Sequence, residues 1–209
     1  MEVFFDEGTG SAAEWGSTGR VFISKYVNRS NTDIYEYYLD GEKIYGMPTP
    51  KLRESDRLTK NSAIETEPAL SPDGRYLALI SDRTGSPQVY VRDMQRKKLT
   101  RITENGNYNV SPSWSPDGKF IAYASRRSGV SSIYRIDPKS KEENRVTPKN
   151  MNAESPTWSP DGSMIAFSGK KGGDWKIYYS LSSGGQAVRL TNSKAGLQET
   201  MPSWGPSLR

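Results

Sequence analysis

Residues 114–124, with the sequence WSPDGKFIAYA, contain a turn motif that occurs three times in this chain. Related copies lie at 70–75 (LSPDGR) and 158–163 (WSPDGS), and their aspartates, Asp73, Asp117 and Asp161, are each 44 residues apart. A constant period of this length is the mark of a repeat protein, in which every copy forms one supersecondary unit. The repeat therefore has to be interpreted before any single motif.

The period extends beyond the turn to the end of each unit. An apolar triplet with a central alanine follows each turn at 77–79, 121–123 and 165–167. A threonine closes each unit, and four of them share the spacing: Thr59, Thr103, Thr147 and Thr191. Four units therefore end in register.

The SPDG turn has a clear physical role. Proline presets φ, aspartate accepts local backbone hydrogen bonds, and glycine takes the left-handed conformation, so the turn joins a first and a second strand as a hairpin. The second strand is apolar at almost every position, which indicates cover on both faces. Radially stacked units of four strands make a β-propeller. We therefore predict an all-β fold of four-stranded antiparallel blades; the alternative, a β-sandwich, would not demand so regular a period.

Composition narrows the classes of function. The 209 residues include no His and no Cys, which excludes Ser-His-Asp and Cys-His catalysis, thiolate metal sites and disulfides. The net charge of +5 is spread among 24 acidic residues without a basic cluster, so nucleic-acid binding is not expected. No run of 18 apolar residues occurs, so membrane insertion is not expected, and residues 1–8 show no signal peptide.

The repeated residues resemble the blades of TolB-like β-propellers, which carry a W-S-P-D-G-x-x-[IL]-A-[FY] signature. The likeness covers about residues 19–208 and is strongest in the blades 67–103, 111–147 and 155–191. The first unit, 20–59, keeps its later strands but has no SPDG turn. The motif is specific for this type of propeller and much less so for function, because such blades accompany many activities.

The end of the chain resembles an inner strand with nothing after it, at 201–206 (MPSWGP). In the family the C-terminal segment is typically a lone inner strand, so the resemblance implies that 201–209 complete the blade 20–59. This gives a propeller domain of four blades over 20–209, with 1–19 as an N-terminal extension. Closure of the ring would leave no sheet edge exposed to aggregation. Trp15 competes with Trp204 for the inner position, and the resemblance favours Trp204.

The number of blades leaves the assembly open. Four are fewer than the six that the resemblance implies, and the amino-terminal domain of that family has no counterpart here. A closed monomer, a part of a larger ring and a paired ring of two chains are all compatible with the sequence.

The loops between strands provide the candidate binding residues. In the family the loops joining the second to third strand, and the fourth to the next first strand, share the partner-binding face. We expect a basic rim around an acidic centre, from Arg83, Arg127 and Lys171 in the first set and from Glu65, Asn109, Glu154 and Glu199 in the second. Complementary charge would steer a partner there, although ordinary solvated loops carry such charges too.

Aromatic residues divide into two groups. Tyr90, Tyr134 and Tyr178 recur at the repeat step and are expected in the core, as are Trp114 and Trp158 between blades. Tyr108 lies outside the pattern in a loop, where an aromatic side chain often anchors an interface. No catalytic or metal motif is found, and GTGSAA at 8–13 is only a partial dinucleotide fingerprint, so no cofactor is expected.

These observations predict a non-enzymatic protein-interaction scaffold. The resemblance implies a periplasmic location and a partner in the bacterial envelope, such as a peptidoglycan-associated lipoprotein or a Tol component. Two alternatives are a non-catalytic propeller accessory of a peptidase or carbohydrate-active enzyme, and a propeller that binds a glycan or small ligand at its axial opening.

Overall fold

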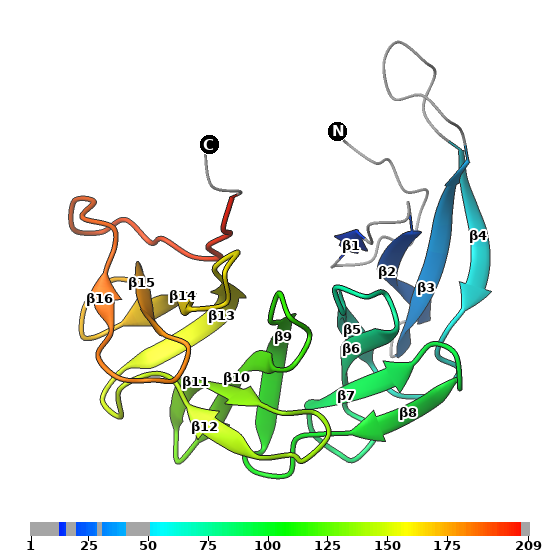
Figure 1. Cartoon of the computed structure of the whole chain (residues 1–209), viewed down its shortest axis with the longest axis horizontal. Helices are drawn as coiled ribbons and strands as arrows, with labels where there is room; N and C mark the ends of the chain where they lie inside the picture. The colour runs from blue at the N-terminus through cyan, green and yellow to red at the C-terminus, as the bar shows by residue number, and fades with distance from the viewer. Residues whose placement is uncertain (1–12, 16–19, 29–30, 41–50, 206–209) are drawn as a thin grey trace.

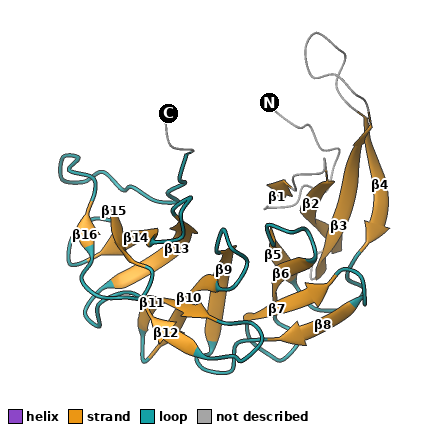
Figure 2. Ribbon diagram, viewed as in Figure 1, coloured by secondary structure: helices purple, strands orange, loops and turns teal. Residues whose placement is uncertain are grey.

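The computed structural model describes residues 13–15, 20–28, 31–40 and 51–205. In these residues sixteen strands form four sheets, each of four strands (Figure 1). The described segments consist of strands and loops (Figure 2) and include no helix long and apolar enough to cross a membrane.

Each sheet is one blade, and its strands follow one another in chain order. Blade 1 has β1 (Ala13–Trp15), β2 (Arg20–Asn28), β3 (Asn31–Asp40) and β4 (Lys51–Arg57). Blade 2 has β5 (Glu65–Leu70), β6 (Tyr76–Ser81), β7 (Gln88–Asp93) and β8 (Lys98–Arg101). Blade 3 has β9 (Tyr108–Trp114), β10 (Ile121–Arg127), β11 (Val130–Ile136) and β12 (Glu143–Arg145). Blade 4 has β13 (Asn152–Trp158), β14 (Met164–Lys170), β15 (Lys176–Leu181) and β16 (Val188–Arg189).

The predicted antiparallel blades are confirmed, because every neighbouring pair of strands within a sheet is antiparallel. The blades lie side by side in an arc, with blade 1 at one end and blade 4 at the other (Figure 1). Apolar clusters fill the spaces between consecutive blades: Phe22 with Leu77 between blades 1 and 2, for example, and Ala122 with Phe167 between blades 3 and 4. The core is therefore a series of blade-to-blade layers.

The SPDG segments form the predicted turns between the first and second strands. In the turn before β10, the Gly118 N–H donates to the Ser115 carbonyl at 2.9 Å, and φ of Gly118 is +68°. The Ser115 hydroxyl donates to Asp117 at 2.7 Å, and the carboxylate also accepts the Lys119 N–H at 3.1 Å. These bonds fix the chain reversal within the turn itself.

The inner strands share a second repeated feature. Glu67, Ser111 and Ser155 have φ of +50°, +55° and +53°, and each of them precedes a proline. The pairing with the second strand shifts register at these places, as expected for a β-bulge, where proline is tolerated. The Glu67 carboxylate accepts the Ser111 N–H of the next blade at 2.7 Å. Burial raises the pKa of Glu67, although this bond and the Ser111 side chain oppose the rise.

Tryptophan side chains join blades 3 and 4 to the blade before each of them. The indole Nε1–H of Trp114 donates to the Ala69 carbonyl at 3.0 Å, and that of Trp158 donates to the Ser113 carbonyl at 2.9 Å. Both rings are buried, as the sequence predicted. Trp204 repeats the contact, because its indole donates to the Thr157 carbonyl at 3.2 Å.

The position of Trp204 corrects the expected completion of blade 1. The inner partner of β2 is β1, with Trp15 opposite Val21, so residues 13–15 hold the place that the resemblance gave to 201–209. Residues 201–205 lie instead against blade 4, where the Met201 N–H donates to the Ser168 hydroxyl at 2.9 Å. Residues 206–209, and most of the expected extension 1–19, lie outside the described residues. The domain boundaries stay a prediction.

The side of blade 4 that faces away from blade 3 is more exposed than the equivalent sides of blades 2 and 3. Ile102 and Val146, one residue before the closing threonines of blades 2 and 3, are each only 1% exposed. Leu190 holds the same position in blade 4 and is 57% exposed. The described part of the chain therefore places no further blade against blade 4.

Candidate partner-binding face

Two sets of loops lie at one end of the blades. The start of each first strand pairs with the end of the second, with Glu65 opposite Ser81, Tyr108 opposite Arg126 and Asn152 opposite Lys170. Neighbouring blades are also joined here, because the Asn109 N–H donates to the Pro87 carbonyl at 2.9 Å. We call this continuous surface the loop face; it comprises residues 59–65, 82–87, 102–109, 126–130, 147–154, 171–175 and 190–200.

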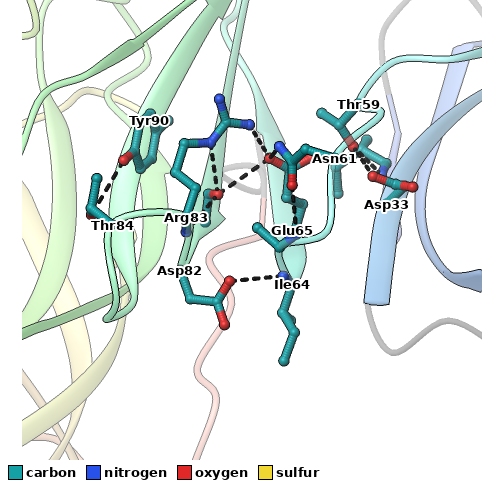
Figure 3. A network of polar contacts seen from close by, with 12 residues as sticks. Asp33, Thr59, Asn61, Ile64, Glu65, Asp82, Arg83, Thr84 and Tyr90 are labelled. Atoms are coloured by element: carbon teal, nitrogen blue, oxygen red, sulfur yellow. Dashed lines mark hydrogen bonds and ion pairs between the residues drawn. The ribbon is translucent and has the colours of Figure 1, made fainter. Parts of the chain in front are cut away.

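Arg83 and Glu65, expected on the rim and at the centre of this face, form an ion pair with each other (Figure 3). Glu65 is fully buried and also accepts hydrogen bonds from Asn61 at 3.0 Å and Ser81 at 3.2 Å. The Arg83 guanidinium lies 5.2 Å from the centre of the Tyr90 ring, which completes its packing. Asn61, Asp82 and Arg83 line a shallow hollow beside this network.

Arg127 is neutralised in a similar way within blade 3. Its guanidinium donates to both carboxylate oxygens of Glu143, at 2.7 and 2.8 Å, and lies 3.7 Å from the centre of the Tyr134 ring. The Tyr123 hydroxyl donates to the same carboxylate at 2.6 Å. Burial opposes ionisation of Glu143, but the bonds from Arg127 and Tyr123 outweigh it and hold the Glu143 pKa below its usual value.

Asn109 is buried and belongs to a network that supports the loop face from beneath. Its amide donates to Gln88 Oε1 at 2.7 Å and to the Asn105 carbonyl at 3.0 Å. The Thr103 hydroxyl donates to the same Gln88 oxygen at 2.8 Å. Asn109 therefore positions the loop 103–107 and offers no exposed surface to a partner.

The remaining candidates are accessible. Tyr108 is 47% exposed at the start of β9, and Glu154 and Lys171 are exposed without an ion pair in the part of the chain that is described. Glu199 is partly exposed and accepts the Thr191 hydroxyl at 2.6 Å, while Lys176 lies 3.6 Å away. The Thr191 bond, more than the cation, lowers the pKa of Glu199. A partner would therefore find an exposed aromatic and charges of both signs, with the two arginines partly shielded.

Sequence reasoning missed four arginines that also follow the repeat. Each lies two residues before a closing threonine and donates through Nε to the carbonyl of that threonine: Arg57, Arg101, Arg145 and Arg189, at distances of 3.1, 2.6, 2.8 and 2.6 Å. The recurring Arg-x-Thr motif was the signal in the sequence that could have identified these arginines. These cations brace the ends of the fourth strands at the border of the loop face.

No group of three or more Asp and Glu side chains that could hold a metal ion occurs in the described segments. Every perturbed carboxylate described above has a structural partner. Internal ion pairs hold the loops in place, and a few side chains remain exposed on the loop face.

Comparison with known proteins agrees with the architecture. Residues 26–208 match the family model described as TolB beta propeller domain. The Tol-Pal system protein TolB of Bordetella pertussis (strain Tohama I) is 50% identical over 34 residues, which are 16% of this chain and 8% of that protein. The matched stretch thus spans a small part of this curated relative.

Solved structures resemble a much longer part of the chain. TolB from Acinetobacter baumannii is 22% identical with a TM-score of 0.70, over 91% of this chain and 45% of that one. A putative TolB from Agrobacterium tumefaciens is 25% identical with a TM-score of 0.66, over 89% and 66%. A puromycin-hydrolyzing peptidase of Mycobacterium tuberculosis, 15% identical with a TM-score of 0.63 over 89% and 30%, shares the fold alone.

Proposed function

The chain belongs to the TolB beta-propeller domain family, and on that premise we propose that it is a non-catalytic scaffold that binds protein partners of the bacterial envelope through its loop face. The observation that carries the proposal is the exposed Tyr108 on a surface that neighbouring blades make continuous. Aromatic side chains on rigid supports are frequent anchors of protein interfaces.

The internal ion pairs support this role. Because Arg83 and Arg127 are held by Glu65 and Glu143, the surface between the blades is fixed before a partner arrives. A preformed surface loses less conformational entropy on binding than a flexible one. The exposed Lys171 and Glu154 provide charges that orient the partner.

The name of the curated relative suggests where to look for the partner. Because that protein is named as part of a Tol-Pal system, we propose a periplasmic location and a partner of the peptidoglycan-associated lipoprotein or Tol type. The complete absence of His and Cys from the sequence favours a role without catalysis.

Isothermal titration of the chain with the soluble domain of a peptidoglycan-associated lipoprotein, and with periplasmic Tol domains, tests the proposal. The triple variant Tyr108→Ala, Glu154→Lys, Lys171→Glu should bind at least about tenfold more weakly than the parent. A control triple, Tyr38→Ala, Lys97→Glu, Glu142→Lys, changes an exposed aromatic and two charges outside the loop face, and it should bind like the parent.

Two results would contradict the proposal in different ways. Equal binding by the parent and the loop-face variant would show that another surface holds the partner. Failure of the parent to bind any of these envelope domains would remove the proposed class of partner.

A further inference from the structure

A groove of about 250 Å³ lies between blades 2 and 3, at the end of the strands opposite the loop face. It is lined by the hairpins that join the third and fourth strands of the two blades, by the turn before β10 and by strand residues of blade 2 as far as Ile102, at the border of the loop face. Nothing in the proposed function uses this end of the molecule.

The floor of the groove is apolar and aromatic. Tyr76 and Trp114 stack with ring centres 6.3 Å apart and an angle of 29° between their planes, and Val91 lies beside them in the lining. The indole N–H of Trp114 is already donated to the Ala69 carbonyl, so the ring offers only its apolar surface to a ligand. The floor therefore suits an apolar side chain.

The rim of the groove is cationic. Arg96 and Lys98 come from the hairpin that joins β7 to β8, and Lys139 comes from the hairpin that joins β11 to β12. All three are exposed, with no ion pair in the described part of the chain. The one acidic residue among those lining the groove, Asp93, is already satisfied: it accepts the N–H groups of Gln95 and Arg96, both at 3.0 Å, and lies 3.6 Å from Arg75. Asp93 therefore serves Arg75 and Arg96, while Lys98 and Lys139 have no anion of their own among the described residues.

The basic rim is not a by-product of the repeat. One repeat further on, a groove between blades 3 and 4 is lined by Phe120 and Trp158, the equivalents of Tyr76 and Trp114. The positions equivalent to the three cations hold Ser140, Glu142 and Ser183. The aromatic floor follows from the blade fold, whereas these three cations have no counterpart in the groove between blades 3 and 4.

We propose that this groove binds an acidic peptide segment of a partner protein, with one apolar side chain of the segment on the Tyr76–Trp114 floor and its carboxylates on the three cations. Charge complementarity selects an acidic segment, and an apolar pocket with a few well-placed charged groups is the usual design of a ligand site. The three cations lie outside the loop face, so two partners could be held at once.

The probes are three capped pentapeptides with the sequences DEFED, DEAED and KKFKK. Calorimetry, together with tryptophan fluorescence, should show binding of DEFED that weakens as salt increases. DEAED should bind at least about fivefold more weakly because it lacks the apolar side chain, and KKFKK should not bind. Equal binding of DEFED and DEAED, or no binding of DEFED, would overturn the proposal.

Matched charge variants locate the site. The pair Lys98→Glu, Lys139→Glu should weaken DEFED binding by at least about tenfold. The control pair Lys149→Glu, Lys194→Glu makes the same change of net charge at exposed positions of the loop face, outside the groove. Its binding of DEFED should stay within about twofold of the parent. An equal loss of DEFED binding in the two pairs would mean that only the net charge of the protein matters. That result would contradict a defined site.

Discussion

The Asp161 carboxylate shows how a single residue stabilises a turn. It accepts the Ser159 hydroxyl at 2.6 Å and the N–H of Ser163 at 3.0 Å, and the Ser163 hydroxyl lies within 2.9 Å of both its oxygens. The Ser159 bond contributes most, and together these donors lower the pKa of Asp161 to about 2. Donors that favour the charged form of a carboxylate are the usual cause of such a shift.

This shift predicts a loss of stability in acid. An unfolded aspartate has a pKa of about 3.9, so the contribution of Asp161 is complete above about pH 4 and is lost as the pH falls towards about 2. Urea unfolding of the parent should show this loss between pH 4 and pH 2, and Asp161→Asn should lose less over the same interval. An Asp161 pKa near 3.9 in an NMR titration, or equal losses in the two proteins, would contradict the assignment.

The SPDG turns and the buried tryptophans were predictable because their causes are local or periodic. The pairing of Arg83 with Glu65 was not, since it depends on a loop folding back onto the strand beside it. The sequence indicates which charges belong to the loops. It does not indicate which of them neutralise one another, and this decided how much of the expected basic rim is available to a partner.

Within each blade, the closing threonine joins the fourth strand to the third. Its hydroxyl accepts an N–H from the third strand in all four blades, at 2.9 Å from Ile34, 3.0 Å from Val89, 3.1 Å from Ile133 and 3.0 Å from Ile177. The repeated threonines were visible in the sequence, but their bonds were not, because the partner lies 14 residues earlier in blades 2, 3 and 4.

We expect Thr103→Val to lower the free energy of unfolding by about 1–3 kcal/mol. The substitution leaves the buried Val89 N–H without an acceptor and removes a donor from Gln88. Thr100→Val, at an exposed position of the same strand, serves as the control and should change the stability by less than about 0.5 kcal/mol. Similar losses in both variants would mean that the hydroxyl bonds contribute little.

At the scale of the whole molecule, the four blades form an arc (Figure 1). The side of blade 4 that faces away from blade 3 is uncovered at Leu190. The repeat predicted the blades and their order, since a constant period is a property of the entire fold. It could not decide which segment pairs with β2, because Trp15 and Trp204 both occur in sequences typical of an inner strand. That choice depends on how far the arc extends, which no local pattern records.

The exposure of Leu190 on the uncovered side of blade 4 leads to a prediction about stability. Val146→Ala should cost about 2 kcal/mol because Val146 is packed between blades. Leu190→Ala, at the equivalent position of blade 4, should change the stability by less than about 0.5 kcal/mol, even though it removes a larger side chain. Urea denaturation of the two variants checks this, and equal losses would show that Leu190 is covered in solution.

Three core clusters of the described residues each join two adjacent blades, and the fourth lies within blade 1. The arc therefore behaves energetically as a short linear chain of coupled units. In such a chain an end unit has one neighbour and a central unit has two, so opening starts at the ends and moves inwards. Amide protons of blades 2 and 3 should therefore exchange with solvent more slowly than those of blade 4. A partner that covered blade 4 would lengthen the cooperative array and slow exchange there without touching the interior.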